Sequence, residues 1–140
     1  MVWYAMGKRL VGIVCCICSL ICLAGCTLAD KSEKVRDLEY TVVKEDEIPE
    51  ALRLQIEEKK AARFKLTYMD GSSLYIACGY GEQLTGGYSI AMKELYMTQQ
   101  AVYFATELHG PGKGETVCKS PSYPYIVVKL EQIELPIVFE

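Results

Sequence analysis

Histidine, tryptophan and phenylalanine are scarce in this sequence of 140 residues, which holds one, one and three of them respectively. His109 is the single histidine, and beyond residue 26 the sequence has no Cys-x-x-Cys pair and no His-x-x-x-His pair. Zinc sites usually need such closely spaced ligands. A catalytic thiol at Cys78 or Cys118 that used His109 has no support from spacing either. We therefore predict a protein that is not an enzyme and that has no metal or other cofactor.

Basic residues are also in short supply: 15 Lys and Arg stand against 18 Asp and Glu, a formal charge of −3. Without a basic patch, binding to nucleic acid is not expected. Phosphate-binding motifs are missing too, because the glycines at 79, 81, 86 and 87 match neither a dinucleotide fingerprint nor a P-loop. The segment 87–91 lacks the second glycine of a nucleophile elbow. These absences favour a binding protein over an enzyme.

The first 26 residues resemble a bacterial lipoprotein leader. Lys8 and Arg9 precede an apolar run at 10–23, and Leu23-Ala24-Gly25-Cys26 follows. The run is shorter than the roughly 20 residues of a spanning helix, and small residues precede the cut as processing requires. The lipobox resemblance implies cleavage before Cys26 and lipid on that cysteine. Residues 1–25 are therefore predicted to be a signal peptide, with the start at Met1 or Met6 left open; an uncleaved anchor and a soluble secreted chain are the alternatives.

Lipidation of Cys26 predicts a protein that is anchored to the cell membrane and faces the extracytoplasmic side. Two or more acyl chains hold a protein stably, whereas one holds it marginally. Residues 26–37 are polar and aperiodic, which predicts a flexible tether, and 38–140 suits one domain. Loss of two basic residues with the leader changes the formal charge from −3 to −5.

Two cysteines remain in the predicted domain. Four of the seven, at positions 15, 16, 18 and 22, leave with the leader, and Cys26 carries lipid. Outside the cytoplasm Cys78 and Cys118 could pair as a disulfide, but Cys78 ends an apolar strand and could equally be a buried free thiol. Sequence spacing does not place their Cα atoms within bonding range, so both alternatives stay open.

Alternating apolar and polar residues predict strands through most of the domain. Asp70-Gly71 favours a tight type I′ turn between two of them. Apolar residues at four-residue spacing predict one amphipathic helix from Ile48 to about Ala62. We therefore expect an α+β fold, a mainly antiparallel sheet of about five or six strands with the helix packed on it. The predicted strands are 38–44, 63–69, 74–78, 88–97, 101–108 and 125–130, and a last apolar run follows at 135–139.

Glycine, proline and tyrosine gather in three stretches, 79–88, 109–114 and 121–124. Loops held on a rigid scaffold are where binding residues tend to lie. Tyrosine is favoured at recognition surfaces, although it also packs well in half-buried strands. The three stretches are therefore predicted either to bind a partner or to fold against their own sheet. The candidate partner-binding residues are Tyr80, Thr85, Gly86, Gly87, Tyr88, Gly110, Pro111, Gly112, Tyr123 and Pro124.

The same loops carry a family resemblance. The segment 85–90, Thr-Gly-Gly-Tyr-Ser-Ile, together with Gly-Pro-Gly at 110–112 and Tyr123-Pro124, resembles the PrcB C-terminal domain family over about residues 72–130. That family occurs in bacterial lipoproteins and is named for a subunit of a protease complex. The resemblance implies a small non-enzymatic domain that assists or stabilises another protein, such as a surface protease.

Three other functions remain open. The segment 84–88 is similar to the Thr-Thr-Gly-Tyr loop of chagasin-like cysteine-protease inhibitors, although it lacks the preceding Asn-Pro. A small-ligand carrier or envelope enzyme would need a concave pocket, with Cys78, Glu82 and His109 as its candidate polar groups. A purely structural lipoprotein would bury its loop tyrosines. The main expectation is a lipid-anchored, non-catalytic module that binds an extracytoplasmic protein.

Overall fold

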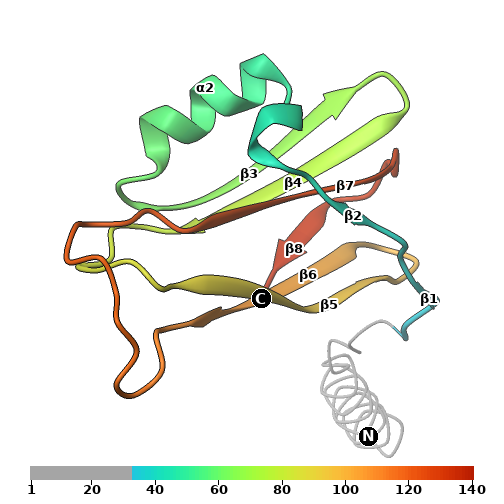
Figure 1. Ribbon diagram of the computed structural model, residues 1–140. Helices are drawn as coiled ribbons and strands as arrows, with labels where there is room; N and C mark the ends of the chain where they lie inside the picture. Colours follow the sequence, from blue (N-terminus) through green and yellow to red (C-terminus); the bar gives the residue numbers. More distant parts are fainter. Residues whose placement is uncertain (1–32) are drawn as a thin grey trace, which may run out of the picture. The chain divides into compact units, whose positions relative to one another are not determined.

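The computed structural model describes residues 33–140, in which eight strands form two four-stranded sheets. The helix-covered sheet has the strand order β2-β7-β4-β3, and the second sheet has the order β1-β5-β6-β8. The two sheets lie face to face, and helix α2 lies on the outer side of the helix-covered sheet (Figure 1). The predicted signal peptide, Cys26 and residues 27–32 of the predicted tether lie outside the described residues.

The strands have the following bounds. The helix-covered sheet contains β2 (Thr41–Val42), β7 (Tyr125–Glu131), β4 (Ser73–Tyr80) and β3 (Arg63–Asp70). The second sheet contains β1 (Arg36–Asp37), β5 (Ser89–Met97), β6 (Val102–His109) and β8 (Ile137–Phe139). All neighbours pair antiparallel except β6 and β8, which are parallel. A 3₁₀ turn, η2 (Glu45–Glu47), precedes α2 (Glu50–Lys59).

The expected α+β class holds in broad terms, but the expected single sheet of five or six strands is wrong. Strand β4 pairs with β7 and not with the next strand in the chain, so the two hairpins β3-β4 and β5-β6 belong to different sheets. Each hairpin has an apolar face toward the other sheet, and stacking buries both of these faces. The opposite face of the β3-β4 hairpin is also apolar and packs in the helix cluster with α2. Alternation along a strand predicts the apolar face but does not say whether two hairpins join edge to edge or stack.

The prediction of one amino-terminal strand at 38–44 is also wrong, because two shorter strands, β1 and β2, form instead. The chain forms β1 beside β5 in the second sheet, crosses over at the buried Leu38, and forms β2 beside β7 in the helix-covered sheet. Arg36 and Asp37, which were expected in the flexible tether, therefore belong to the folded part. Two short strands in different sheets join the layers at one edge.

The predicted β3-β4 hairpin is confirmed, with a different turn. Asp70 pairs with Ser73, so the two turn residues are Gly71 and Ser72. Gly71 has a φ of +59°, and no other residue type in the described chain has a positive φ. A positive φ at the first turn position alone is the pattern of a type II′ turn, not of the expected type I′ turn.

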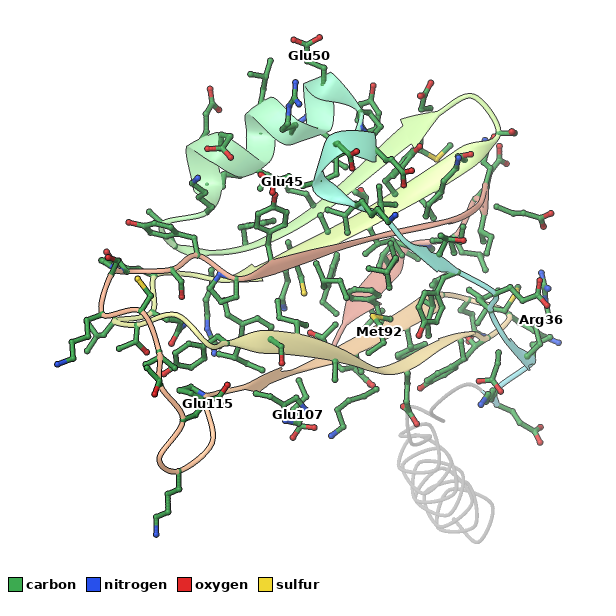
Figure 2. The ribbon with its side chains drawn as sticks, in the orientation of Figure 1. Arg36, Glu45, Glu50, Met92, Glu107 and Glu115 are labelled. Carbon is green, nitrogen blue, oxygen red and sulfur yellow. The ribbon has the colours of Figure 1, made fainter. Side chains whose placement is uncertain are left out.

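Two hydrophobic clusters fill the spaces between the three layers, which are the second sheet, the helix-covered sheet and helix α2. Met92 points into the space between the sheets, whereas Glu107 points away from it (Figure 2). On the other side of the helix-covered sheet, Leu52 and Ile56 of α2 are fully buried, and each contributes about 1.5–3 kcal/mol by its burial. The inter-sheet cluster is formed by Leu38, Leu74, Ile76, Cys78, Leu95, Val102, Phe104, Ile126, Val128 and Leu130. The helix cluster contains Ile48, Leu52, Ile56, Phe64, Tyr75, Ala77 and Val127.

Helix α2 is shorter than expected. It covers ten residues, Glu50–Lys59, because the segment before it forms the 3₁₀ turn and Pro49 occupies the N-cap position. Within residues 33–140, no helix combines the length and the apolar character needed to cross a membrane.

Candidate functional site

The three loops predicted from the sequence meet at one end of the two sheets. Gln83 and Ser122 exchange two backbone hydrogen bonds of 2.8 and 3.0 Å. The N–H of Gly86 donates to the carbonyl of Cys118 at 2.9 Å, and the Ser122 hydroxyl donates to the carbonyl of Thr85 at 2.6 Å. We call residues 81–88 and 110–124 the loop cluster. Hydrogen bonds join its two segments, 81–88 and 110–124. The surface of the loop cluster is therefore preformed.

Glycines make this close packing possible. Gly87 has a φ of +85°, and a Cβ there would lie 2.7 Å from Val117 Cγ1 and 3.0 Å from Pro111 Cβ. A Cβ on Gly110 would lie 3.3 Å from the ring of Tyr88. These predicted site residues therefore pack against other loop residues, and their role is to hold the shape of the loop cluster.

The predicted site tyrosines also make internal contacts. Tyr80 is in β4, and its hydroxyl lies 2.7 Å from the Thr106 hydroxyl on β6, which joins the two sheets. The Tyr123 hydroxyl donates to Glu82 Oε1 at 3.3 Å. The carbonyl of Pro124 accepts a hydrogen bond of 3.1 Å from the N–H of Tyr80. The sequence left open whether Tyr80 binds a partner or packs within the protein. These contacts favour packing within the protein.

Leu84 is a candidate contact residue that was not among those predicted from the sequence. It lies in the glycine-rich loop with 84% of its surface exposed, the highest value among the exposed large apolar side chains of the described chain. Binding residues tend to lie on loops held by a rigid scaffold, and Leu84 offers apolar surface on such a loop. The signal available in the sequence was a lone aliphatic residue inside a polar, glycine-bounded loop.

Cys78 and Cys118 are both free thiols, so the disulfide alternative is not formed. Cys78 is buried, and its Sγ lies 3.4 Å from the Thr106 hydroxyl. Burial raises the pKa of the Cys78 thiol above its ordinary value. Cys118 is exposed in the loop cluster, where hydrogen bonds with the side chain and backbone of Ser120 lower the pKa of its thiol.

The pocket considered for a carrier or enzyme does not form from the expected residues. Cys78 lines a cleft between the sheets, but neither Glu82 nor His109 is part of that cleft. The His109 Nε2 atom instead lies 3.6 Å from Glu107 Oε2, with both side chains about half exposed. Within residues 33–140, no three His, Cys, Asp or Glu side chains gather in a metal-binding group.

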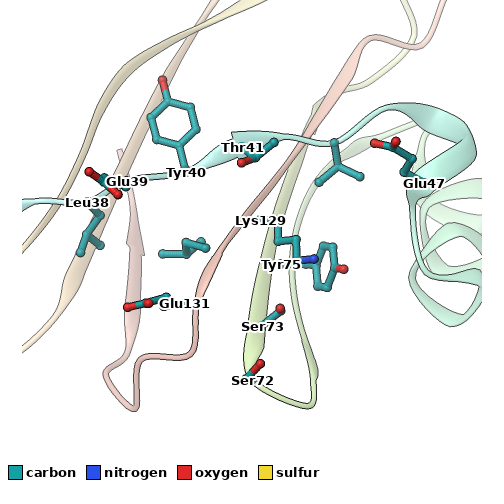
Figure 3. A pocket seen from close by; sticks show the side chains of 12 residues that line it. Leu38, Glu39, Tyr40, Thr41, Glu47, Ser72, Ser73, Tyr75, Lys129 and Glu131 are labelled. Atoms are coloured by element: carbon teal, nitrogen blue, oxygen red, sulfur yellow. The ribbon is translucent and has the colours of Figure 1, made fainter.

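A larger concavity lies elsewhere, beside the crossover segment 38–43 (Figure 3). It has a volume of about 960 Å³ and contains three exposed carboxylates, those of Glu39, Glu47 and Glu131. The Lys129 Nζ atom lies in it, 5.8 Å from the centre of the Tyr75 ring. This concavity is open and carries charges of both signs, so its polar groups do not converge on a single ligand.

These features define a class of protein: a two-sheet domain with one covering helix and a fastened cluster of loops at one end. Residues 74–131 match the family model described as PrcB C-terminal, which confirms over this segment the resemblance found in the sequence. The match runs from β4 through β7 and includes the whole loop cluster. Searches of curated proteins and of solved structures found no match to the chain.

Proposed function

We propose that this protein is a lipid-anchored, non-catalytic subunit that binds another protein on the extracytoplasmic side through its loop cluster. The exposure of Leu84 on loops that are fastened to each other carries the proposal. The PrcB family match supports a protease complex as the setting, since the family takes its name from a subunit of one. Anchoring rests on the lipobox that ends at Cys26.

Preformed loops favour binding energetically. Ordering a flexible side chain at an interface costs about 0.5–1.5 kcal/mol, and fixed loops avoid part of that cost. Burial of a leucine side chain such as Leu84 against a partner contributes about 1.5–3 kcal/mol. In protein interfaces a few residues carry most of the binding energy, and near-neutral contacts surround them.

The anchor limits where the partner can be. Cys26 precedes Arg36 of β1 by ten residues, which span at most about 35 Å when fully extended at 3.3–3.6 Å per residue. The partner therefore lies close to the membrane surface. Cells grown with labelled palmitate should incorporate the label into the wild type and not into Cys26→Ala, and equal labelling of the two proteins would contradict lipidation of Cys26.

The binding proposal is tested by affinity capture from detergent-solubilised membranes, using Leu84→Asp. Leu54→Asp is the matched control, because Leu54 is a leucine of α2 with 60% of its surface exposed. The wild type and Leu54→Asp should recover the same protein, and Leu84→Asp should recover at least tenfold less. Equal recovery by all three proteins, or no reproducible partner, would contradict the proposal.

A protease-inhibitor function uses the same surface and is the second candidate. It is supported by the position of the segment 84–88, which lies against the loop that contains Pro111 and Val117. Addition of the protein to a papain-like protease should then slow peptide hydrolysis in proportion to occupancy, with Leu84→Asp as the weakened variant. Binding without loss of hydrolysis would favour the subunit function over inhibition.

A further inference from the structure

The cleft between the edge strands β3 and β8 is not used by the proposed function. It has a volume of about 370 Å³ and lies between the two sheets, with lining residues from β3, β4, β6 and β8. That volume falls within the usual range for small-molecule sites, about 300–1,000 Å³. The cleft therefore has room for a small ligand.

The walls of the cleft are aromatic. Phe104 of β6 and Phe139 of β8 meet edge to face, with ring centres 5.5 Å apart. Tyr80 lines the cleft from the helix-covered sheet, and its hydroxyl is bonded to that of Thr106. The Thr106 hydroxyl also contacts the Cys78 thiol, so these polar groups have partners inside the protein. These walls therefore suit the apolar part of a ligand.

Two cations from β3 complete the cleft. The Arg63 guanidinium carbon lies 5.3 Å from the centre of the Tyr80 ring, and the Lys65 Nζ atom lies 5.5 Å from the centre of the Phe139 ring. Glu140 also lines the cleft. The ion pairs found within residues 33–140 involve neither Arg63 nor Lys65. In a chain of net negative charge, two such cations in one cleft favour an anionic ligand.

A second cavity continues along β3. It has a volume of about 330 Å³ and shares Lys65 and Phe139 with the first. Its other lining residues include the aliphatic side chains of Leu74, Leu135 and Ile137. A ligand with a carboxylate at the cations could therefore place an aliphatic chain in this cavity.

We propose that the cleft between β3 and β8 binds a small amphipathic carboxylate. Arg63 and Lys65 bind the carboxylate, and the aromatic and aliphatic walls bind its apolar chain. A planar guanidinium suits a carboxylate because it offers two parallel N–H donors, and the ammonium group of lysine adds a second positive charge. This site is independent of Leu84 and the loop cluster.

The test is an NMR titration of the ¹⁵N-labelled full chain with octanoate and octanamide, which share the same chain length but differ in charge. Octanoate should shift the backbone amides of Lys65, Thr106 and Phe139 saturably, and octanamide should bind at least fivefold more weakly. The double variant Arg63→Gln and Lys65→Gln should lose at least fivefold in octanoate affinity and keep its octanamide affinity. Lys59→Gln, an exposed lysine of α2, is the control and should bind both as the wild type does.

A Phe139→Ala variant separates the two parts of the site, because it should weaken octanoate and octanamide alike. Equal affinity for the two probes in the wild type would overturn the carboxylate contact. Shifts that grow linearly without saturation, or that are the same in every variant, would indicate non-specific association of the probes and would overturn the site. Neither result bears on the capture experiment with Leu84→Asp.

Discussion

The ring of Phe64 lies directly against the backbone of Gly79 on the neighbouring strand. The two residues are register partners in β3 and β4, and a Cβ on Gly79 would lie 2.2 Å from Phe64 Cε1. Phe64 belongs to the helix cluster and is 7% exposed. Gly79, which the sequence pattern placed at the start of a glycine-rich loop, is therefore a buried strand residue that leaves space for an aromatic ring.

Gly79→Ala should destabilise the protein by about 1–3 kcal/mol, because the added methyl group overlaps the Phe64 ring. Gly112→Ala is the control and should change stability by less than about 0.5 kcal/mol, since a Cβ there meets only the end of Glu115, at 3.6 Å. Denaturant unfolding measures both. Adding Phe64→Leu to Gly79→Ala should give a smaller loss than the sum of the two single changes, and simple additivity would contradict the contact.

Gly87→Ala should destabilise the protein more than Gly114→Ala. Both glycines have positive φ values, +85° and +77°, but only Gly87 has neighbours within 4 Å. The left-handed backbone costs a residue with a Cβ about 1–2 kcal/mol at either position, and the overlap with Val117 adds to this at Gly87. Val117→Ala should restore part of the stability of Gly87→Ala and none of that of Gly114→Ala. Equal losses at the two glycines would contradict packing within the loop cluster.

Cys118 should react with iodoacetamide well before Cys78 in the native protein. Cys118 is exposed, and its hydrogen bonds with Ser120 lower its thiol pKa, so more of it is thiolate at a given pH. Burial raises the pKa of Cys78 and also limits access to its sulfur. Peptide mass mapping over time distinguishes the two sites. Ser120→Ala should slow the reaction at Cys118, and protection of both cysteines until reduction would indicate a disulfide.

Thr98→Val should destabilise the turn between β5 and β6 by about 1–3 kcal/mol, because it leaves backbone donors without a partner. Thr98 is fully buried, and its hydroxyl oxygen accepts hydrogen bonds from the N–H groups of Gln100 and Ala101. Valine keeps the shape but removes that oxygen. Thr98→Ser keeps the oxygen and should lose less stability in thermal unfolding. A larger loss for serine than for valine would assign the role of Thr98 to packing.

The local elements were largely predictable from the sequence. The β3-β4 and β5-β6 hairpins, strand β7 and helix α2 all follow from apolar periodicity, which depends on near neighbours in the chain. The turn at Gly71 was misassigned by one residue because Asp70 completes a strand pair, and pairing register depends on the partner strand. The exposure of Leu84 was not predicted, since it depends on the position of the loop against the segment that contains Cys118.

By itself the sequence determined most of the strand segments after residue 60, where helix α2 lies and which three loops are rich in glycine, proline and tyrosine. Those properties follow from side-chain volume, alternation and backbone freedom within a few residues. Only the tertiary structure decided that the hairpins stack as two sheets and that Gly79 faces the ring of Phe64. It also placed Arg63 and Lys65 at a cleft with Phe139, far away in the chain. These relationships arise when distant apolar faces are buried against each other, and no local pattern encodes which faces meet.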